Sequence, residues 1–165
     1  RTRRGMGVVW AGRGATQTNH LQWTVRFAIA KEQEAIDFYT QLAATAKWEA
    51  VANELRSIAA MEVDHKQRLQ RMNIQVAATT VNPKATNLKI ADYLVEIQPS
   101  DNMTWQDILN IAMRRELVAM NLYNDLASII ADGTAKQMVE NLSAEESKHK
   151  LYFEGIWDQE ILTEN

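Results

Sequence analysis

The stretch "IAAMEVDHKQRL", residues 58–69, carries a carboxylate and an imidazole in the middle of an apolar stripe. Ile58, Glu62, His65 and Leu69 follow one another at intervals of 4, 3 and 4 residues, which places them on one face of an α-helix. An ionised carboxylate in a protein core is strongly unfavourable unless it is paired or bound to a metal. The stretch therefore predicts a helix whose buried face needs a partner for the Glu62 side chain.

The composition of the chain is typical of a helical protein. With 165 residues, 46% of them hydrophobic, the chain is long enough for one domain with a sizeable core. Gly and Pro are scarce, at 6 and 2 residues, whereas Ala, Leu, Glu, Gln and Met, which favour helices, are plentiful. We therefore expect a single all-α domain.

Composition also excludes several classes of site and partner. Since the chain has no cysteine, it can hold no disulfide, zinc-thiolate site or iron–sulfur cluster, and any metal must be bound by His, Asp and Glu. Nothing in this composition indicates an oxidising compartment, so we expect a cytoplasmic protein. A net charge of -3 argues against nucleic acid as the main partner, and no segment approaches the roughly 18 uninterrupted apolar residues of a membrane span.

Hydrophobic periodicity predicts four helices. They cover about residues 21–47, about residues 48–72, the stretch from "MTWQD" to "ADGT", and about residues 135–161. Thr18 or Asn19 can cap the first helix. Thr104 and Asp107 have capping-box spacing at the start of the third, and Gly133 suits the left-handed position at its end.

Two segments stand outside these helices. The first 14 residues, "RTRRGMGVVWAGRG", are basic, glycine-rich and without period. They predict a flexible arm of residues 1–18 ahead of a domain of residues 19–165, and an arm that touches nucleic acid or a membrane is the alternative. Residues 73–103 hold both prolines and several Asn and Thr, so they predict a long connection in which "LKIADYL" forms one short packed element.

Each expected helix carries an apolar stripe that is interrupted by the same kinds of polar side chain. One glutamate interrupts the stripe of the first and of the third helix, and a Glu-x-x-His motif interrupts the stripes of the second and fourth. We expect all of these carboxylates and imidazoles to face the interior of the protein. The side chains are Glu32, Glu62, His65, Glu116, Glu146 and His149.

The two halves of the chain are copies of one helical hairpin. An offset of 84 residues without gaps aligns identical residues over both hairpins. An internal duplication of this kind indicates a repeated structural unit, and two helical hairpins make a four-helix bundle. The aligned pairs include Glu32 and Glu116, Tyr39 and Tyr123, Glu62 and Glu146, and His65 and His149.

The distance of these residues from the turns places them at one depth. In an antiparallel hairpin, two residues lie at the same level when the midpoint of their numbers falls on the turn. Glu32 and Glu62 have their midpoint at residue 47, on the expected turn. Glu116 and Glu146 have theirs at residue 131, within "ADG". All six side chains can therefore meet in one layer about 22 Å from the turns, at roughly 1.5 Å per helical residue.

This layer predicts a site for two metal ions. Four buried carboxylates carry four negative charges, which two divalent cations would neutralise, and no lysine or arginine occupies the stripes. A single Glu-x-x-His is a weak indication, but two of the 3 histidines occupy this motif at equivalent places of a repeat. Oxygen-rich ligation with one imidazole per metal suits iron or manganese, and zinc can occupy such a site.

Other polar residues near these motifs have different interpretations. His20 lies near the expected first cap without a carboxylate motif, so we expect it to be structural or exposed. Glu145 precedes Glu146 outside the Glu-x-x-His spacing, so we expect it to be solvated. For Tyr39 and Tyr123 two interpretations stay open: core aromatics, or hydrogen-bond partners of the ligands and radical-quenching groups.

Four segments carry these motifs: "KEQEAIDFYTQLA" followed by "MEVDHK", and "RRELVAMNLYNDLA" followed by "EESKHK". They resemble the two half-sites of the rubrerythrin group in the ferritin-like superfamily, and the similarity extends over about residues 21–162. The resemblance implies a non-haem di-iron centre in which Glu62 and Glu146 bridge the metals. The remaining ligands would then be Glu32 and His65 for one iron, and Glu116 and His149 for the other.

The resemblance also implies a function and partners. We expect an oxidoreductase in which bound Fe(II) reacts with hydrogen peroxide or O2, a homodimer, and a connection of residues 73–103 that crosses the length of the bundle. Rubrerythrins proper carry an additional domain with a cysteine-ligated iron, and this chain has no cysteine. The electron donor should therefore be an external protein.

One departure from the rubrerythrin pattern concerns the reaction itself. Rubrerythrins tend to place an extra glutamate one turn after the ligand of the third helix, where this sequence has Ala119. We expect the alanine to restrict the exchange of ligands during the redox cycle. Two other classes of function stay open: iron binding or delivery without turnover, and a structural metal site in an interaction protein.

Overall fold

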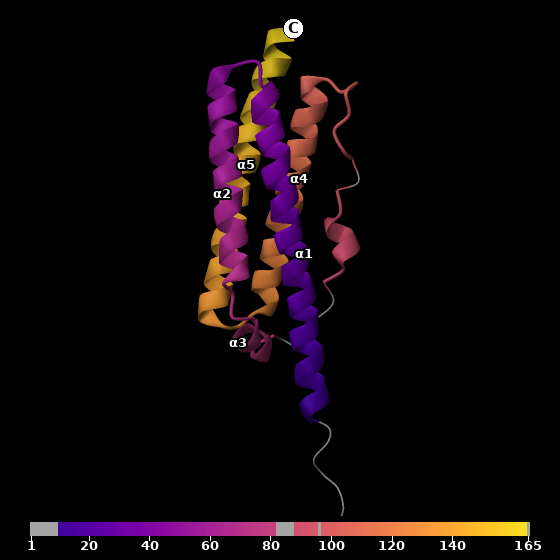
Figure 1. The fold of residues 1–165 in the computed structure, drawn as a ribbon, viewed down its shortest axis with the longest axis vertical. Helices are drawn as coiled ribbons and strands as arrows, with labels where there is room; N and C mark the ends of the chain where they lie inside the picture. Colours follow the sequence, from indigo (N-terminus) through magenta and orange to yellow (C-terminus); the bar gives the residue numbers. More distant parts are fainter. Residues whose placement is uncertain (1–9, 82–87, 96, 165) are drawn as a thin grey trace, which may run out of the picture.

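The computed structural model describes residues 10–81, 88–95 and 97–164, and these residues are mainly helical, without strands. Four long helices, α1 (Trp10–Thr45), α2 (Glu49–Gln70), α4 (Trp105–Ile129) and α5 (Gly133–Glu164), form a bundle (Figure 1). Two short elements, α3 (Ile74–Thr79) and the 3-10 helix η1 (Ile90–Tyr93), lie in the connection between α2 and α4. The predicted all-α fold class is confirmed.

Consecutive long helices form two antiparallel hairpins that pack against each other. α1 lies beside α2 and α4 beside α5, and the hairpins meet where α1 contacts α4 and α2 contacts α5. Because α2 ends and α4 begins at opposite ends of the bundle, the connection runs along its length, with α3 against α1 and η1 against α4 (Figure 1). This is the crossover that the resemblance implied.

Two helix starts form as the sequence predicts. α2 begins at Glu49, after Trp48 with its extended backbone. At the start of α4, Thr104 Oγ1 accepts a hydrogen bond from the Asp107 N–H (3.2 Å), and the Asp107 carboxylate accepts one from the Thr104 N–H (2.9 Å). The capping box therefore closes although aspartate replaces the usual glutamate or glutamine. The short element expected in "LKIADYL" is also present, as η1.

The first helix begins at Trp10, whereas the sequence predicts a start near Leu21. Thr18 and Asn19 consequently lie inside α1 and do not cap it. Residues 10–18 of the expected arm are helical, and its residues 1–9 lie outside the described residues. The physical reason is that glycine disfavours a helix by only about 1 kcal/mol, whereas proline, which could end it, is absent from this segment.

The turn between α4 and α5 also differs from the prediction. Gly133 is the first residue of α5 and lies outside the left-handed region, so it does not terminate α4. The Asp132 carboxylate instead caps α5 by accepting a hydrogen bond from the Ala135 N–H (2.9 Å).

The sequence did not predict the short helix α3. Directly after α3, Thr80 Oγ1 accepts hydrogen bonds from the N–H groups of Ala131 and Asp132 (3.2 and 2.9 Å). These bonds attach the connection between the hairpins to the turn between α4 and α5.

The core of the bundle consists of two apolar clusters. One includes Leu21, Leu69 and Leu142 and lies toward α3, and the other includes Phe38 and Leu55 and lies toward the opposite end. On each long helix, the buried residues between the two clusters include the glutamates and histidines singled out from the sequence. A buried polar layer therefore divides the apolar core.

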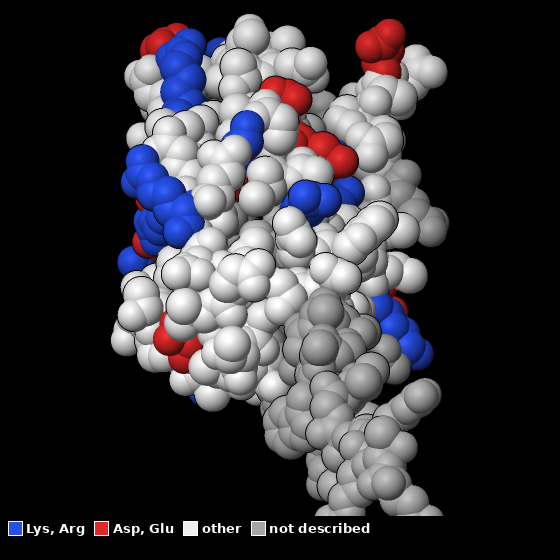
Figure 2. Space-filling model, turned by 60° about the horizontal axis from the view of Figure 1, so that its bottom comes forward, with Lys and Arg blue, Asp and Glu red and all other residues white. Residues whose placement is uncertain are grey.

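The outer surface carries both signs of charge. Basic and acidic side chains lie on the same face of the protein in Figure 2, in keeping with the net charge of -3. Across the three described ranges, no helix combines the length and the apolar character that a membrane span requires.

Candidate metal centre

The six side chains that were expected to meet in one layer do so. Each is almost fully buried, with at most 4% of the residue exposed. Their common depth agrees with the midpoints of the two hairpins. Glu32 comes from α1, Glu62 and His65 from α2, Glu116 from α4, and Glu146 and His149 from α5.

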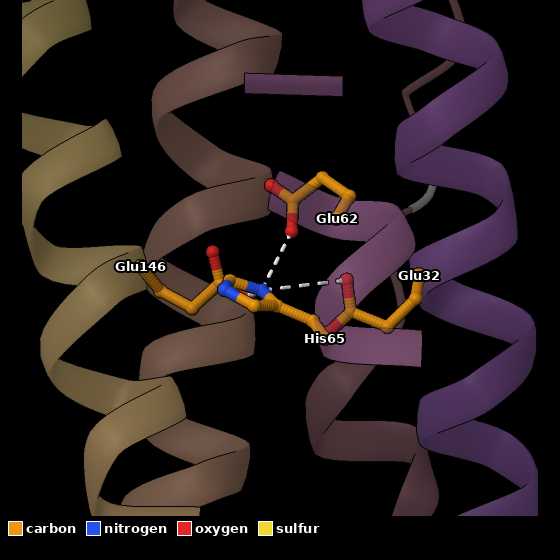
Figure 3. A group of neighbouring side chains, drawn as sticks. All are labelled: Glu32, Glu62, His65 and Glu146. Atoms are coloured by element: carbon orange, nitrogen blue, oxygen red, sulfur yellow. Dashed lines mark hydrogen bonds and ion pairs between the residues drawn. The ribbon is translucent and has the colours of Figure 1, made fainter. Parts of the chain in front are cut away.

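In one half of the layer, His65 lies among three carboxylates, which point toward it from α1, α2 and α5 (Figure 3). Its Nδ1 atom is 2.8 Å from Glu62 Oε2, 3.2 Å from Glu146 Oε1 and 3.9 Å from Glu32 Oε2. One ligand atom from each of the four residues lies within 4.8 Å of the other three. This spacing is suited to a single metal ion.

The other half repeats this arrangement around His149. The Nδ1 atom is 3.1 Å from Glu62 Oε1, 3.2 Å from Glu146 Oε2 and 3.6 Å from Glu116 Oε2. Glu62 and Glu146 thus belong to both groups, and each directs one oxygen to each half. Such a carboxylate can bridge two metal ions.

Hydrogen bonds among the six side chains cannot satisfy all of their buried donor and acceptor atoms, whereas metal ions could. Each Nδ1 faces three carboxylates, yet an imidazole nitrogen carries at most one proton to donate. Although Glu62 Oε2 is buried and close to His65, no hydrogen bond of suitable geometry reaches it. A buried oxygen without a hydrogen bond is costly. Divalent cations in the two halves would complete the coordination of these atoms, and the oxygen-rich donor set suits iron or manganese.

Electrostatics in the metal-free layer favour bound protons. Burial, and next the charge of Glu146, raise the pKa of Glu32 and Glu116 well above its usual value. Burial alone would lower the pKa of His65 and His149, but the surrounding carboxylates raise it to about 11 and about 12, respectively. Burial would raise the pKa of Glu146, yet the two histidines lower it to about 2. Metal ions must therefore displace protons from this layer.

Two tyrosines join the hairpins through the layer. The Tyr39 hydroxyl on α1 donates a hydrogen bond to Glu116 Oε1 on α4, and the Tyr123 hydroxyl on α4 donates one to Glu32 Oε1 on α1. Tyr39 also stacks on Phe153, with ring centroids 5.4 Å apart. The tyrosines are therefore buried core aromatics and also hydrogen-bond partners of the proposed ligands, and their radical-quenching role stays a prediction.

The expectation that Glu145 is solvated is wrong. Its Oε2 atom lies 2.6 Å from His65 Nε2, and its carboxylate accepts two hydrogen bonds from Arg68 (3.1 and 3.0 Å). The stripe pattern could not find this contact because Glu145 sits beside the stripe and meets a helix of the other hairpin. His20 is half-buried on α1, about three turns before Glu32, and belongs to neither group.

A small cavity of about 40 Å³ adjoins the layer between α1 and α4. All four glutamates line it, together with Ala35 and Ala119, which are equivalent positions of the duplicated hairpins. Neither histidine does. The layer thus has an accessible carboxylate side and an imidazole side, where His65 meets Glu145 and His149 meets Met61.

Comparisons with solved structures show the same fold in other proteins. A proposed ferritin-like diiron-carboxylate protein from Thermotoga maritima superposes with a TM-score of 0.68 and 19% identity, covering 85% of this chain and 95% of that chain. A hypothetical protein from Pyrococcus furiosus gives a TM-score of 0.63 at 22% identity, covering 84% and 88%. The comparison with curated protein sequences gave no significant match.

The comparison with protein families identifies the family of the chain, whereas the solved structures show only its fold. The Rubrerythrin family profile matches residues 24–157, which contain all four long-helix segments of the layer and every proposed ligand. The match covers well over half of the 165 residues. The chain therefore belongs to the rubrerythrin family.

Proposed function

We propose that the protein is a non-haem di-iron oxidoreductase that reduces hydrogen peroxide or O2 with electrons from an external donor protein. The observation that carries this proposal is the cavity of about 40 Å³ that reaches all four carboxylates of the layer. It offers a small oxidant a place next to both proposed metal positions. Family membership supports a di-iron centre, and the oxygen-rich donor set supports iron in it.

The two groups of side chains divide the proposed ligands between two ions. Glu62 and Glu146 would serve both, because each directs one oxygen to each half. Two ferrous ions would supply one electron each, which, with two protons, reduces one H2O2 to two H2O. The ligands completing each half are Glu32 with His65, and Glu116 with His149.

The chain's own residues position the ligands and shape the space beside them. Tyr39 and Tyr123 bind Oε1 of Glu116 and Glu32, so that in each glutamate the Oε2 atom is the one nearest the imidazole of its half. The small side chain of Ala119 leaves the cavity room for a molecule of a few atoms. The apolar clusters on both sides of the layer keep bulk water away from the site.

The 165 residues contain no cysteine, so they cannot form the cysteine-ligated iron of rubrerythrins proper, and electrons must reach the layer from outside them. We propose a separate electron-transfer protein as donor. The homodimer expected from the resemblance stays a prediction.

Anaerobic loading with Fe(II), followed by separate pulses of H2O2 and O2 and by a chemical reductant, tests the proposal. We expect rapid oxidation of bound iron and repeated cycles as reductant is supplied. A single stoichiometric oxidation without re-reduction would contradict turnover and indicate iron handling. A redox-silent zinc that cannot be exchanged would contradict the proposal and indicate a structural metal site.

A further inference from the structure

The duplication of the hairpin breaks at one pair of residues that face the histidines. The offset of 84 that aligns the glutamates and histidines also pairs Met61 with Glu145. Each reaches across to the histidine of the other hairpin: Glu145 Oε2 is 2.6 Å from His65 Nε2, and Met61 Sδ is 3.4 Å from His149 Nε2. The two half-sites therefore have a similar arrangement of carboxylates but a different residue behind the imidazole.

The carboxylate behind His65 is a fixed, charged acceptor. Arg68 holds Glu145 with two hydrogen bonds (3.1 and 3.0 Å), and Arg68 in turn is held by Asp64, which accepts a hydrogen bond from Nε (2.7 Å). When His65 Nδ1 binds a metal, the remaining ring proton is on Nε2 and points at this carboxylate. A carboxylate in that place orients a metal-bound imidazole and makes it a stronger donor.

The thioether of Met61, behind His149, orients the imidazole less firmly and strengthens it less as a metal ligand. Methionine sulfur is a weak, uncharged hydrogen-bond acceptor. The two rings lie nearly parallel, with centroids 5.9 Å apart and planes that differ by 19°. Each Nδ1 atom faces three carboxylate oxygens at 2.8–3.9 Å, so the clearest difference between the half-sites is the residue behind each ring.

We propose that Glu145 is a positioning residue that makes the two metal positions unequal, so that the first metal ion binds in the His65 half and the second, more weakly, in the His149 half. This inference rests on the metal centre of the proposed function but not on its redox reaction. Partners behind a metal-binding histidine typically change metal affinity by about 10- to 100-fold. The two binding steps of this protein should differ by about that factor.

Zinc titration of the metal-free full chain tests the inference without any redox chemistry. Calorimetry gives the affinities of the two steps, and imidazole ¹⁵N chemical shifts show which Nδ1 binds first. We expect His65 Nδ1 to shift with the first equivalent and His149 Nδ1 with the second. Binding first at His149, or two steps of equal affinity, would overturn the proposal.

Exchanging the two residues provides the decisive variants. Glu145→Met should weaken the first step by about 10- to 100-fold and make the steps nearly equal, and Met61→Glu should strengthen the second. The double exchange should reverse the order, so that His149 binds first. Unchanged affinities in Glu145→Met and in the double exchange would overturn the proposal.

Two further variants separate the effect from folding and from overall charge. Glu145→Gln keeps the size of the side chain and should weaken the first step less than Glu145→Met does, with the metal-free helix content unchanged. Glu140→Met makes the same replacement as Glu145→Met on an exposed part of α5 and should alter neither step.

If zinc binds in the expected order but iron does not turn over, the oxidoreductase proposal fails and this inference stands. If zinc does not bind in this layer at all, this inference fails, and the Fe(II) loading experiment decides the oxidoreductase proposal separately.

Discussion

Glu62 and Glu146 differ from the other two glutamates of the layer because each of them contacts both histidines. Glu32 and Glu116 each contact one histidine and are held by a tyrosine from the neighbouring hairpin. At the scale of residues, the proposed centre therefore has two carboxylates that serve both halves and two that each serve one half.

This division predicts unequal effects of removing a carboxylate. Glu62→Ala removes an oxygen from both halves, so metal content should fall from about two ions per chain to below about one, because each half loses a ligand. Glu32→Ala should mainly weaken the His65 half and leave about one ion bound. Metal analysis after equilibrium dialysis measures both. Equal losses in the two variants would remove the support for bridging.

Ala119 provides a prediction about reactivity. It lines the cavity, so Ala119→Glu places a fifth carboxylate beside the layer. This carboxylate should let the oxidised metal exchange ligands, and turnover with supplied reductant should rise severalfold, although the added charge also tends to destabilise the metal-free bundle. Single-turnover oxidation and reduction rates on fully metallated protein measure the effect. Ala119→Gln, of similar size but uncharged, is the control; rates equal to wild type in Ala119→Glu would contradict the role assigned to Ala119.

The sequence predicted six buried side chains of the layer but misjudged Glu145, and the reason is geometric. Helical periodicity reports which residues share the face of one helix, and Glu62, His65 and Glu146 lie on such faces. Glu145 acts from the flank of α5 on a histidine of α2, 80 positions earlier in the chain. Only the packing of the two hairpins brings these residues together.

At the scale of elements, the capping box at the start of α4 fixes where the crossover ends and the second hairpin begins. Thr104→Ala removes the side-chain acceptor for the Asp107 N–H and should lower the free energy of unfolding by about 1 kcal/mol. For a chain of this size, that corresponds to a fall in melting temperature of roughly 2–4 °C. Thermal unfolding monitored by circular dichroism measures it.

The matched control for this prediction is Thr40→Ala. Thr40 is exposed in the interior of α1, so the same replacement there removes no cap. Since alanine has the higher helix propensity, this variant should be as stable as wild type or slightly more so. A melting temperature equally low in both variants would show that the cap contributes nothing.

Periodicity predicted the helices themselves better than their ends. The stripes and the duplication fixed the number and pairing of the long helices, because burial of an apolar face dominates helix stability in a bundle. Local signals decided the ends less reliably: Gly12 and Gly14 lie inside α1, and Gly133 starts α5 because Asp132 supplies the cap. A glycine permits a helix end without requiring one.

At the scale of the whole molecule, protons and metal ions compete for one layer that the entire bundle encloses. In the metal-free protein, the pKa values of His65 and His149 are raised to about 11 and about 12, and those of Glu32 and Glu116 are also raised. Groups whose pKa is raised on folding contribute stability below their unfolded pKa, and this contribution is lost as the pH rises toward the folded value. The metal-free layer is therefore most favourable in its protonated form.

This linkage predicts opposite responses to pH with and without metal. Between about pH 7 and pH 9, the urea midpoint of the metal-free protein should fall, because the unfolded histidines release their protons while the folded layer must retain them. The metal-loaded protein should not lose stability over this range, since metal affinity increases as competing protons become scarce. Urea unfolding at several pH values measures both midpoints. A metal-free protein that gains stability over this range would contradict the prediction.

The central claim is that the six side chains of the layer bind two metal ions in two halves of one centre. Anaerobic titration of the metal-free chain with Fe(II), followed by melting-temperature measurements at each addition, tests it most directly. The two groups predict saturation at two ions per chain, and the melting temperature should rise because the unfolded chain lacks the assembled site. Saturation at one ion per chain, with no change in melting temperature, would contradict the account.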